Sequence, residues 1–361
     1  MKTINMTSHQ ISHRVVVCGL LTVLCGALPL CAQVPAPKFK VSAQRVDRQP
    51  NGNVRLEGKA HIQTPEVDVK AQSIALDITG NQVTQVRAQN QVAFKLDLPA
   101  KDGGAPAHVE ATCDAATLNP LPRTLLLSGN VSGWYQVGGG ARNTLSGDSA
   151  TIKYVGKDLM VDVNGGTRGV SISIPAEKDN PAAIGTVTLT AQRATFNNNT
   201  GVATFTGKAR AVSTDGPNKF DVAAPAFILT RGAGGAIDRL TTSGRTQIKI
   251  DLPPEPAAAK PADAAASTIP EIGRPTHVEA EADGVVVRRA TNTMDFQGNV
   301  KGFYELAAPG ATATKYDFVG DRVAIKYVMK DISNAAIVPG LKVEMIGVPV
   351  EINAPAFNLS F

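Results

Sequence analysis

The chain has 361 residues, of which 43% are apolar and 19% charged, and this composition excludes an intrinsically disordered protein. Its formal net charge of +5 is too small to indicate a nucleic-acid-binding protein. Aromatic residues make up only 5%, whereas 33 glycines and 23 prolines favour many turns between short strands over long helices.

The N-terminal segment 1–32 has the pattern of a secretory signal peptide. Lys2 and Arg14 supply positive charge ahead of the apolar run Val15–Leu30, and Ala32 is a small residue suited to a cleavage site. A retained membrane anchor is the alternative, because the run is close to the lower limit of roughly 17 residues for a spanning helix. Cleavage would leave Cys113 as the single cysteine, which cannot form an internal disulfide.

Most of the remaining chain is a duplication. The segment KLDLP at 95–99 returns as KIDLP at 249–253, HVEA at 108–111 returns at 277–280, and IKYV at 152–155 returns at 325–328. The order is kept, so we predict two repeats, 38–176 and 186–361. A Pro/Ala-rich segment at about 253–276 interrupts the second repeat and is interpreted as a tolerated surface insertion.

Alternation of apolar and polar residues is the dominant local pattern. It runs through 54–63 in the first repeat and keeps its phase through 203–211 in the second. Successive side chains on a strand point to opposite faces, so both repeats should present one apolar and one polar face. No segment after the signal peptide has a convincing helical period, and we therefore predict an all-β fold.

Two irregularities recur in both repeats. The phase of the alternation changes after Ala71 and after Ala224, which predicts a β-bulge at equivalent positions. Trp134 and Phe303 fall on the polar side of the following strands. A glycine bulge would return them to the core, and exposed aromatics used for contacts are the alternative; the sequence leaves both open.

Motifs of enzyme chemistry are missing from the sequence. The histidines after the signal peptide, His61, His108 and His277, have no metal-ligand spacing, and no nucleophile elbow or phosphate-binding loop is present. Asp148 and Asp321 each follow a glycine, which is typical of turns. We therefore expect a protein that is not an enzyme and has neither cofactor nor metal.

The spaced glycine, valine and alanine residues of Leu56–Ala60 and Val67–Asp77, and of Leu127–Val131 followed by Gly147–Tyr154, resemble OstA/LptA-type units. The resemblance extends over most of 38–361. It implies an elongated, twisted β-jelly-roll built from tandem repeats and located in the periplasm. It also implies a carrier that holds the acyl chains of lipopolysaccharide in an apolar trough and joins other lipopolysaccharide-transport proteins through sheet edges.

On this interpretation the ligand is lipopolysaccharide or another acylated envelope lipid, and homo-oligomerisation and membrane association are left open. The alternative is a structural or assembly protein of the cell envelope, with a closed core and partner-docking edges. The candidate groove residues share the inward phase of the alternation. The alternative for each of them is that it is an ordinary core residue. They are Leu56, Ile62, Val67, Val69, Leu127, Val131 and Tyr135 in the first repeat, and Phe205, Phe220, Val222, Phe296, Val300 and Tyr304 in the second.

Overall fold

The computed structural model describes residues 40–80, 82–100, 105–155, 158–176, 185–216, 219–232, 237–251, 274–288, 291, 293–307, 312–326 and 342–344. Within these ranges every regular element is a β-strand and every pairing is antiparallel, which confirms the all-β prediction. None of the described residues belongs to a helix long and apolar enough to cross a membrane. The predicted signal peptide, 1–32, and most of the insertion at 253–276 lie outside the described residues.

The chain divides into two compact units. Unit 1 contains residues 1–139 and 149–157, and unit 2 contains residues 140–148 and 158–361. Strand β8 (Asn143–Val155) therefore contributes its first half to unit 2 and its second half to unit 1. The units are defined by contacts, whereas the repeats 38–176 and 186–361 are defined by sequence, and the repeat boundaries stay predictions.

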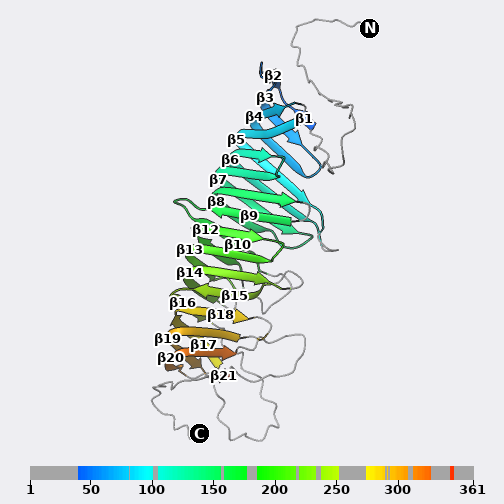
Figure 1. The fold of residues 1–361 in the computed structure, drawn as a ribbon. Coiled ribbons are helices and arrows are strands. Elements are labelled where there is room, and N and C mark those ends of the chain that lie inside the picture. The colour runs from blue at the N-terminus through cyan, green and yellow to red at the C-terminus, as the bar shows by residue number, and fades with distance from the viewer. Residues whose placement is uncertain are drawn as a thin grey trace, which may run out of the picture. The chain divides into compact units, whose positions relative to one another are not determined.

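Unit 1 is a ladder of strands in chain order (Figure 1). β3 to β7 pair successively, and both β1 and β2 pair with β3. The strands of the ladder are β1 (Lys40–Ser42), β2 (Arg45–Arg48), β3 (Val54–Gln63), β4 (Val67–Thr79), β5 (Gln82–Leu98), β6 (Ala107–Asn119) and β7 (Thr124–Val137).

Unit 2 combines long strands with pairs of short ones. Each of the long strands β13, β14 and β19 pairs with two short strands, one along each half of its length. The strands are β9 (Asp158–Asn164), β10 (Val170–Ile174), β11 (Val187–Ala191), β12 (Arg193–Asn197), β13 (Val202–Ser213), β14 (Lys219–Arg231), β15 (Ile237–Ser243), β16 (Thr246–Asp251), β17 (Arg274–Ala282), β18 (Gly284–Arg288), β19 (Thr293–Ala307), β20 (Thr314–Lys326) and β21 (Lys342–Glu344).

Five of the long strands bend at a corner in mid-strand. At each corner two successive residues have positive φ, and the pairing register shifts there. Positive φ suits glycine and, less well, asparagine, which accounts for the glycines and asparagines of the corners but not for Lys59, Gln91 and Lys208. The corner pairs are Gly58 and Lys59, Asn90 and Gln91, Gly129 and Asn130, Gly207 and Lys208, and Gly298 and Asn299.

A side chain from the neighbouring chain segment covers each glycine corner. Asn130 Nδ2 donates a hydrogen bond of 2.7 Å to Asp114 Oδ2, and Asn299 Nδ2 donates one of 2.6 Å to Asp283 Oδ2. A Cβ atom on Gly129 would lie 2.3 Å from Asp114 Oδ2. The corner therefore requires glycine for both its dihedral angles and its space.

The bends turn the apolar faces of the two strand halves toward a common interior. We call these two faces the two walls of each unit. One end of unit 1 is closed where the β3–β4 turn meets the β6–β7 turn, with Glu66 Oε1 3.6 Å from Arg123 Nη1. Register shifts lie beside Ala71 and Ala224 as predicted, but the extra residues are on the partner strands β3 and β13, so β4 and β14 change phase opposite a bulge. Long antiparallel strands bent around an apolar interior make a jelly-roll-like fold.

We predict that Gly129→Ala lowers the free energy of unfolding by about 1–2 kcal/mol, because alanine must adopt a left-handed conformation, with a further loss because Asp114 has to move. Urea denaturation followed by circular dichroism measures this change. Gly139→Ala is the matched control in the same unit, because nothing lies within 4 Å of its added methyl group. Equal stability of the two variants would contradict the corner assignment.

Candidate functional site

The groove residues predicted from the sequence all point to the interior of their own unit. Ten of them are buried, namely Leu56, Ile62, Val67, Val69, Leu127, Val131, Phe205, Val222, Phe296 and Val300. Three are half-buried, namely Tyr135, Phe220 and Tyr304. The structure thus distinguishes a closed middle from a more accessible margin, and lipid binding by these residues stays a prediction.

The margin of unit 1 is an apolar row that runs across four strands. Val67 on β4 pairs with Leu96 on β5, Leu96 with Val109 on β6, and Val109 with Tyr135 on β7. Val67 and Leu96 are buried, whereas Val109 and Tyr135 are half-buried. The inward face therefore becomes accessible toward β7, near the ends of the strands.

The register-equivalent row of unit 2 is also accessible. It runs through Phe220, Ile250, Val278, Tyr304 and Tyr316 on β14, β16, β17, β19 and β20. All of these side chains except Val278 are half-buried. Tyr304 and Tyr316 stack with ring centroids 5.2 Å apart. We call these two rows the marginal rows.

The middle of each interior contrasts with the marginal rows. Leu56 and Ile74 in unit 1, and Phe227, Phe296 and Val300 in unit 2, have no exposed surface. Side chains in so dense an interior have no room for a ligand without rearrangement. On the inward faces, the accessible apolar side chains named above therefore lie in the marginal rows.

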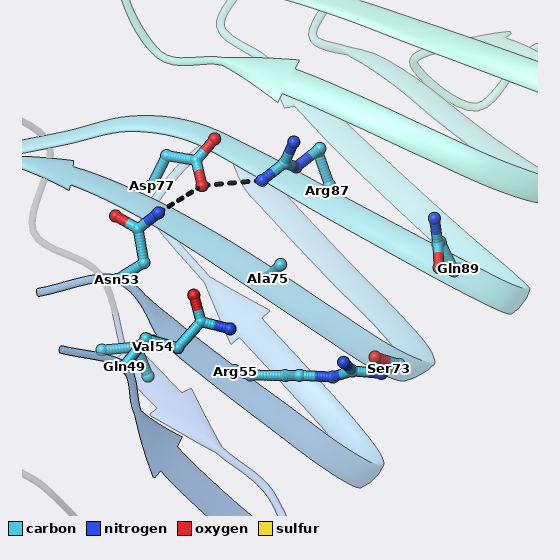
Figure 2. Close-up of a pocket in the computed structure, with 9 residues that line it drawn as sticks. All are labelled: Gln49, Asn53, Val54, Arg55, Ser73, Ala75, Asp77, Arg87 and Gln89. Atoms are coloured by element: carbon cyan, nitrogen blue, oxygen red, sulfur yellow. Dashed lines mark hydrogen bonds and ion pairs between the residues drawn. The ribbon is translucent and has the colours of Figure 1, made fainter. Parts of the chain in front are cut away.

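The outer face of unit 1 has a polar hollow of about 280 Å³ over β3, β4 and β5 (Figure 2). Asp77 lies at one side of it, where Oδ1 accepts hydrogen bonds from Asn53 Nδ2 at 3.0 Å and from Arg87 Nη2 at 2.7 Å. The lining residues are Gln49, Asn53, Val54, Arg55, Ser73, Ala75, Asp77, Arg87 and Gln89.

A second polar feature of the outer face is a row of alternating charge that occurs once in each unit. In unit 1 the pairing register aligns Asp68, Lys95, Glu110 and Trp134 across β4 to β7. In unit 2 it aligns Asp221, Lys249, Glu279 and Phe303 across β14, β16, β17 and β19. Opposite charges in direct cross-strand pairs stabilise a sheet, so the row acts as a lateral tie between strands.

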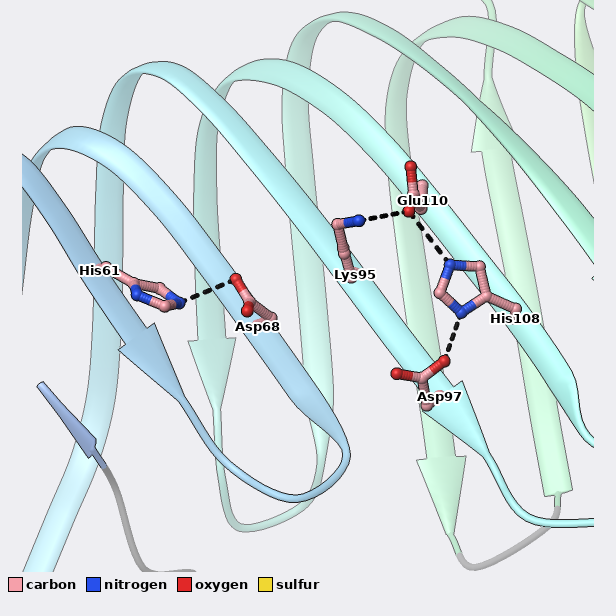
Figure 3. A network of polar contacts seen from close by, with 6 residues as sticks. All are labelled: His61, Asp68, Lys95, Asp97, His108 and Glu110. Atoms are coloured by element: carbon pink, nitrogen blue, oxygen red, sulfur yellow. Dashed lines mark hydrogen bonds and ion pairs between the residues drawn. The ribbon is translucent and has the colours of Figure 1, made fainter.

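Two histidines contact the row of unit 1 (Figure 3): His61 Nε2 lies 3.0 Å from Asp68 Oδ1, and His108 contacts Glu110. His108 Nδ1 contacts Asp97 Oδ1, and His108 Nε2 lies 3.2 Å from Glu110 Oε1, which also accepts a hydrogen bond of 2.5 Å from Lys95 Nζ. A neutral imidazole has only one N–H, so two carboxylate partners favour the doubly protonated ring.

Unit 2 repeats this arrangement. His277 Nδ1 lies 2.5 Å from Asp251 Oδ1 and His277 Nε2 lies 3.1 Å from Glu279 Oε1, while Lys249 Nζ donates to the same Glu279 oxygen at 3.0 Å. The recurrence of these three contacts in both units indicates a retained structural feature.

The positions of Trp134 and Phe303 resolve the alternatives left by the sequence. Both rings are half-buried on the outer face, so the glycine bulge does not return them to the core. Trp134 packs on His108 with ring centroids 5.0 Å apart, and Phe303 packs on His277 at 5.5 Å. Lys315 Nζ lies 3.7 Å from the Phe303 ring centroid. The aromatics therefore cover the histidines of the polar rows.

Sequence reasoning did not identify the polar rows, although the signal was present. The repeated motifs KLDLP and HVEA contain Lys95, Asp97, His108 and Glu110 at alternate positions, so these residues share one face. Pairing of the two motifs on neighbouring strands was the missing information. Among the described residues no group of His, Cys, Asp and Glu is arranged to hold a metal ion. Asp148 and Asp321 are exposed.

We predict that His108 makes stability depend on pH. Burial alone lowers the pKa of His108, but hydrogen bonds to Asp97 and Glu110 outweigh it and raise the pKa above 6.5. A raised pKa means that the stabilisation is complete below the unfolded-state value and is lost as the pH rises through the folded-state value. Urea midpoints at about pH 6 and about pH 8.5 test this.

His108→Gln is the control for this experiment, because glutamine stays neutral at both pH values. The stability difference between wild type and His108→Gln should shrink at the higher pH. A difference that does not change with pH would contradict the assignment.

We also predict that Cys113 is unreactive in the folded protein. The side chain is buried, and burial raises the pKa of the thiol to about 11. The thiolate is the reactive form, so labelling by a disulfide reagent should require unfolding. Because residues 1–32 contain three further cysteines, Cys113→Ser gives the background to subtract. Rapid labelling of Cys113 in native buffer would contradict the prediction.

Comparison with known proteins leaves the family open. No protein-family model matches the chain, and no curated protein matches it. Among solved structures, the chain is similar to LptH from Pseudomonas aeruginosa, described as the LptA homologous periplasmic component of the conserved lipopolysaccharide transport device. The identity is 12%, the TM-score is 0.26, and the match covers 45% of this chain and 95% of LptH. Likeness of this degree does not extend the role of LptH to this chain.

Proposed function

We propose that this protein is a non-enzymatic, lipid-binding or lipid-bridging protein of the bacterial envelope that holds acyl chains against the inward faces of its two units. The observation that carries the proposal is the pair of marginal rows. The two rows occupy equivalent register positions, and each contains a half-buried tyrosine, Tyr135 in unit 1 and Tyr304 in unit 2, on the inward apolar face. Accessible apolar side chains continuous with a core suit an apolar ligand.

The energetics favour partial burial of the lipid. Burying one methylene group is worth about 0.8 kcal/mol, so a chain of about a dozen carbons approaches 10 kcal/mol when fully buried. Several fully buried chains would exceed the practical ceiling of about 18–21 kcal/mol for non-covalent affinity and prevent release. A protein that passes lipid onward therefore benefits from a shallow margin rather than a deep cavity.

The finer parts of the proposal rest on the resemblance to OstA/LptA-type units. They are a periplasmic location, lipopolysaccharide or another acylated envelope lipid as the ligand, and contact with other lipopolysaccharide-transport proteins through sheet edges. The structure is compatible with edge contacts, because the backbone N–H and C=O groups at the edge of a sheet can pair with a strand of another protein.

A structural or assembly role in the envelope is the second candidate. The closed middle of each interior favours it, because Leu56, Phe296 and Val300 pack without exposed surface. On this alternative the marginal tyrosines are ordinary edge residues, and partners dock at sheet edges instead. The two candidates differ in whether the margins bind acyl chains.

The double variant Tyr135→Asp, Tyr304→Asp tests the proposal. Both side chains are half-buried, so the new carboxylates can reach water and the fold should persist. A charge placed beside an acyl chain, however, costs several kcal/mol of binding free energy. We expect binding of lipid A in detergent-free buffer, measured by fluorescent displacement, to weaken by at least roughly tenfold.

Gln136→Asp is the matched control, since it adds the same charge on β7 at the neighbouring position, which faces the other way. Circular dichroism and urea denaturation verify that each variant is folded. Undiminished lipid binding by the folded double variant would overturn the marginal assignment, and no binding by the wild type would favour the structural role.

A further inference from the structure

The polar hollow on the outer face of unit 1 has a simple origin in the strand register. Arg55 on β3 pairs with Ala75 on β4, and Ala75 pairs with Arg87 on β5. The three residues lie in one row, with the smallest side chain between the two longest. Neighbouring strands are about 4.8 Å apart, so the two arginines begin roughly 10 Å apart and flank an open space over the alanine methyl group.

Both arginines keep hydrogen-bond donors beyond their ion pairs. Arg55 contacts Glu57 through Nε at 2.9 Å, and Arg87 contacts Asp77 through Nη2 at 2.7 Å. A guanidinium group has five N–H donors, so each ion pair uses only part of the set. Figure 2 shows both arginines and the amide side chain of Gln89 around Ala75 and Ser73.

The duplication provides an internal comparison for this hollow. The register-equivalent row of unit 2 is Thr204 on β13, Ile228 on β14 and Thr241 on β15. Both arginines are replaced by threonine, and the alanine is replaced by an isoleucine whose side chain occupies the outer face with 39% exposure. The equivalent row of unit 2 therefore keeps the fold without the paired arginines and with the space over the alanine filled.

We infer that this hollow binds the phosphate monoester group of a hydroxylated ligand, with Arg55 and Arg87 donating to the phosphate oxygens. Glu57 and Asp77 each use only part of one guanidinium group, so the remaining N–H donors of both arginines can serve an anion. A phosphate monoester carries about −1.5 to −2 at neutral pH and accepts several charge-assisted hydrogen bonds.

The amides at the rim extend the site beyond the phosphate group. Gln49, Asn53 and Gln89 line the hollow, and Asn53 is held by its hydrogen bond to Asp77. Amide side chains donate and accept, as hydroxyl groups of a sugar require. The phosphate could belong to a soluble sugar phosphate or to a lipid head group that projects from a membrane surface, and the same chemistry serves both.

Binding to the full chain is measured with two kinds of probe. Isothermal titration with glucose 6-phosphate and with glucose tests the soluble source, and co-sedimentation with vesicles containing phosphatidic acid or only phosphatidylcholine tests the lipid source. We expect binding of the phosphate monoester and none of the matched neutral probe. Binding to glucose 6-phosphate alone indicates the soluble source, and binding to phosphatidic acid vesicles indicates the lipid source. Either result supports the phosphate site, and the first also supports contacts of the rim amides with hydroxyl groups.

Ala75→Ile is the decisive variant, because it fills the hollow with the residue that unit 2 carries at the same register position and should therefore fold. It and Arg87→Gln should each weaken binding by roughly tenfold or more. Arg210→Gln removes an equally exposed arginine that pairs with Asp221 in unit 2, and it should leave binding unchanged.

Absence of binding to every phosphate probe, or equal binding by wild type and folded Ala75→Ile, would overturn the inference. The site lies on the outer face, so Tyr135→Asp, Tyr304→Asp should leave phosphate binding intact. Failure of the acyl-chain proposal and failure of this one are therefore separate observations.

Discussion

The left-handed corner is the constraint on which each unit depends. A strand that alternates apolar and polar residues has one buried face, and a simple bend would move that face away from the core. Two successive residues with positive φ, as at Gly129 and Asn130, insert a bulge and turn the strand while its apolar residues stay inside. Glycine is needed because Asp114 lies against the position of a Cβ atom. The hydrogen bond between Asp114 and Asn130 then fixes the corner.

Much of this architecture could be predicted from the sequence because it depends on local patterns. The alternation in 54–63 indicated strands, and the shared phase change beside Ala71 and Ala224 indicated bulges, since both depend on neighbours in the chain. The positions of Trp134 and Phe303 could not be decided in this way. They depend on how the strand continues after the glycine corner, and on ring contacts with His108 and His277, which lie on a neighbouring strand.

The candidate sites show the same division between local and non-local information. Inward phase identified the groove residues as a set, but it could not separate buried Val131 from half-buried Tyr135, because exposure depends on which wall covers each position. The hollow over Ala75 was not predicted at all. Arg55 and Arg87 are separated in sequence and flank Ala75 only because of the registers of two strand pairs. The periodicity of the sequence does not specify these registers.

The long strands of unit 2 have a mechanical consequence. Because β13, β14 and β19 run unbroken through both walls, the walls are covalently continuous at every long strand, and they cannot part without cutting the backbone. The short partner strands add no such continuity. In β13 and β19 the two walls join at a corner with a glycine at positive φ, so the separation of the walls depends on a few backbone torsions there.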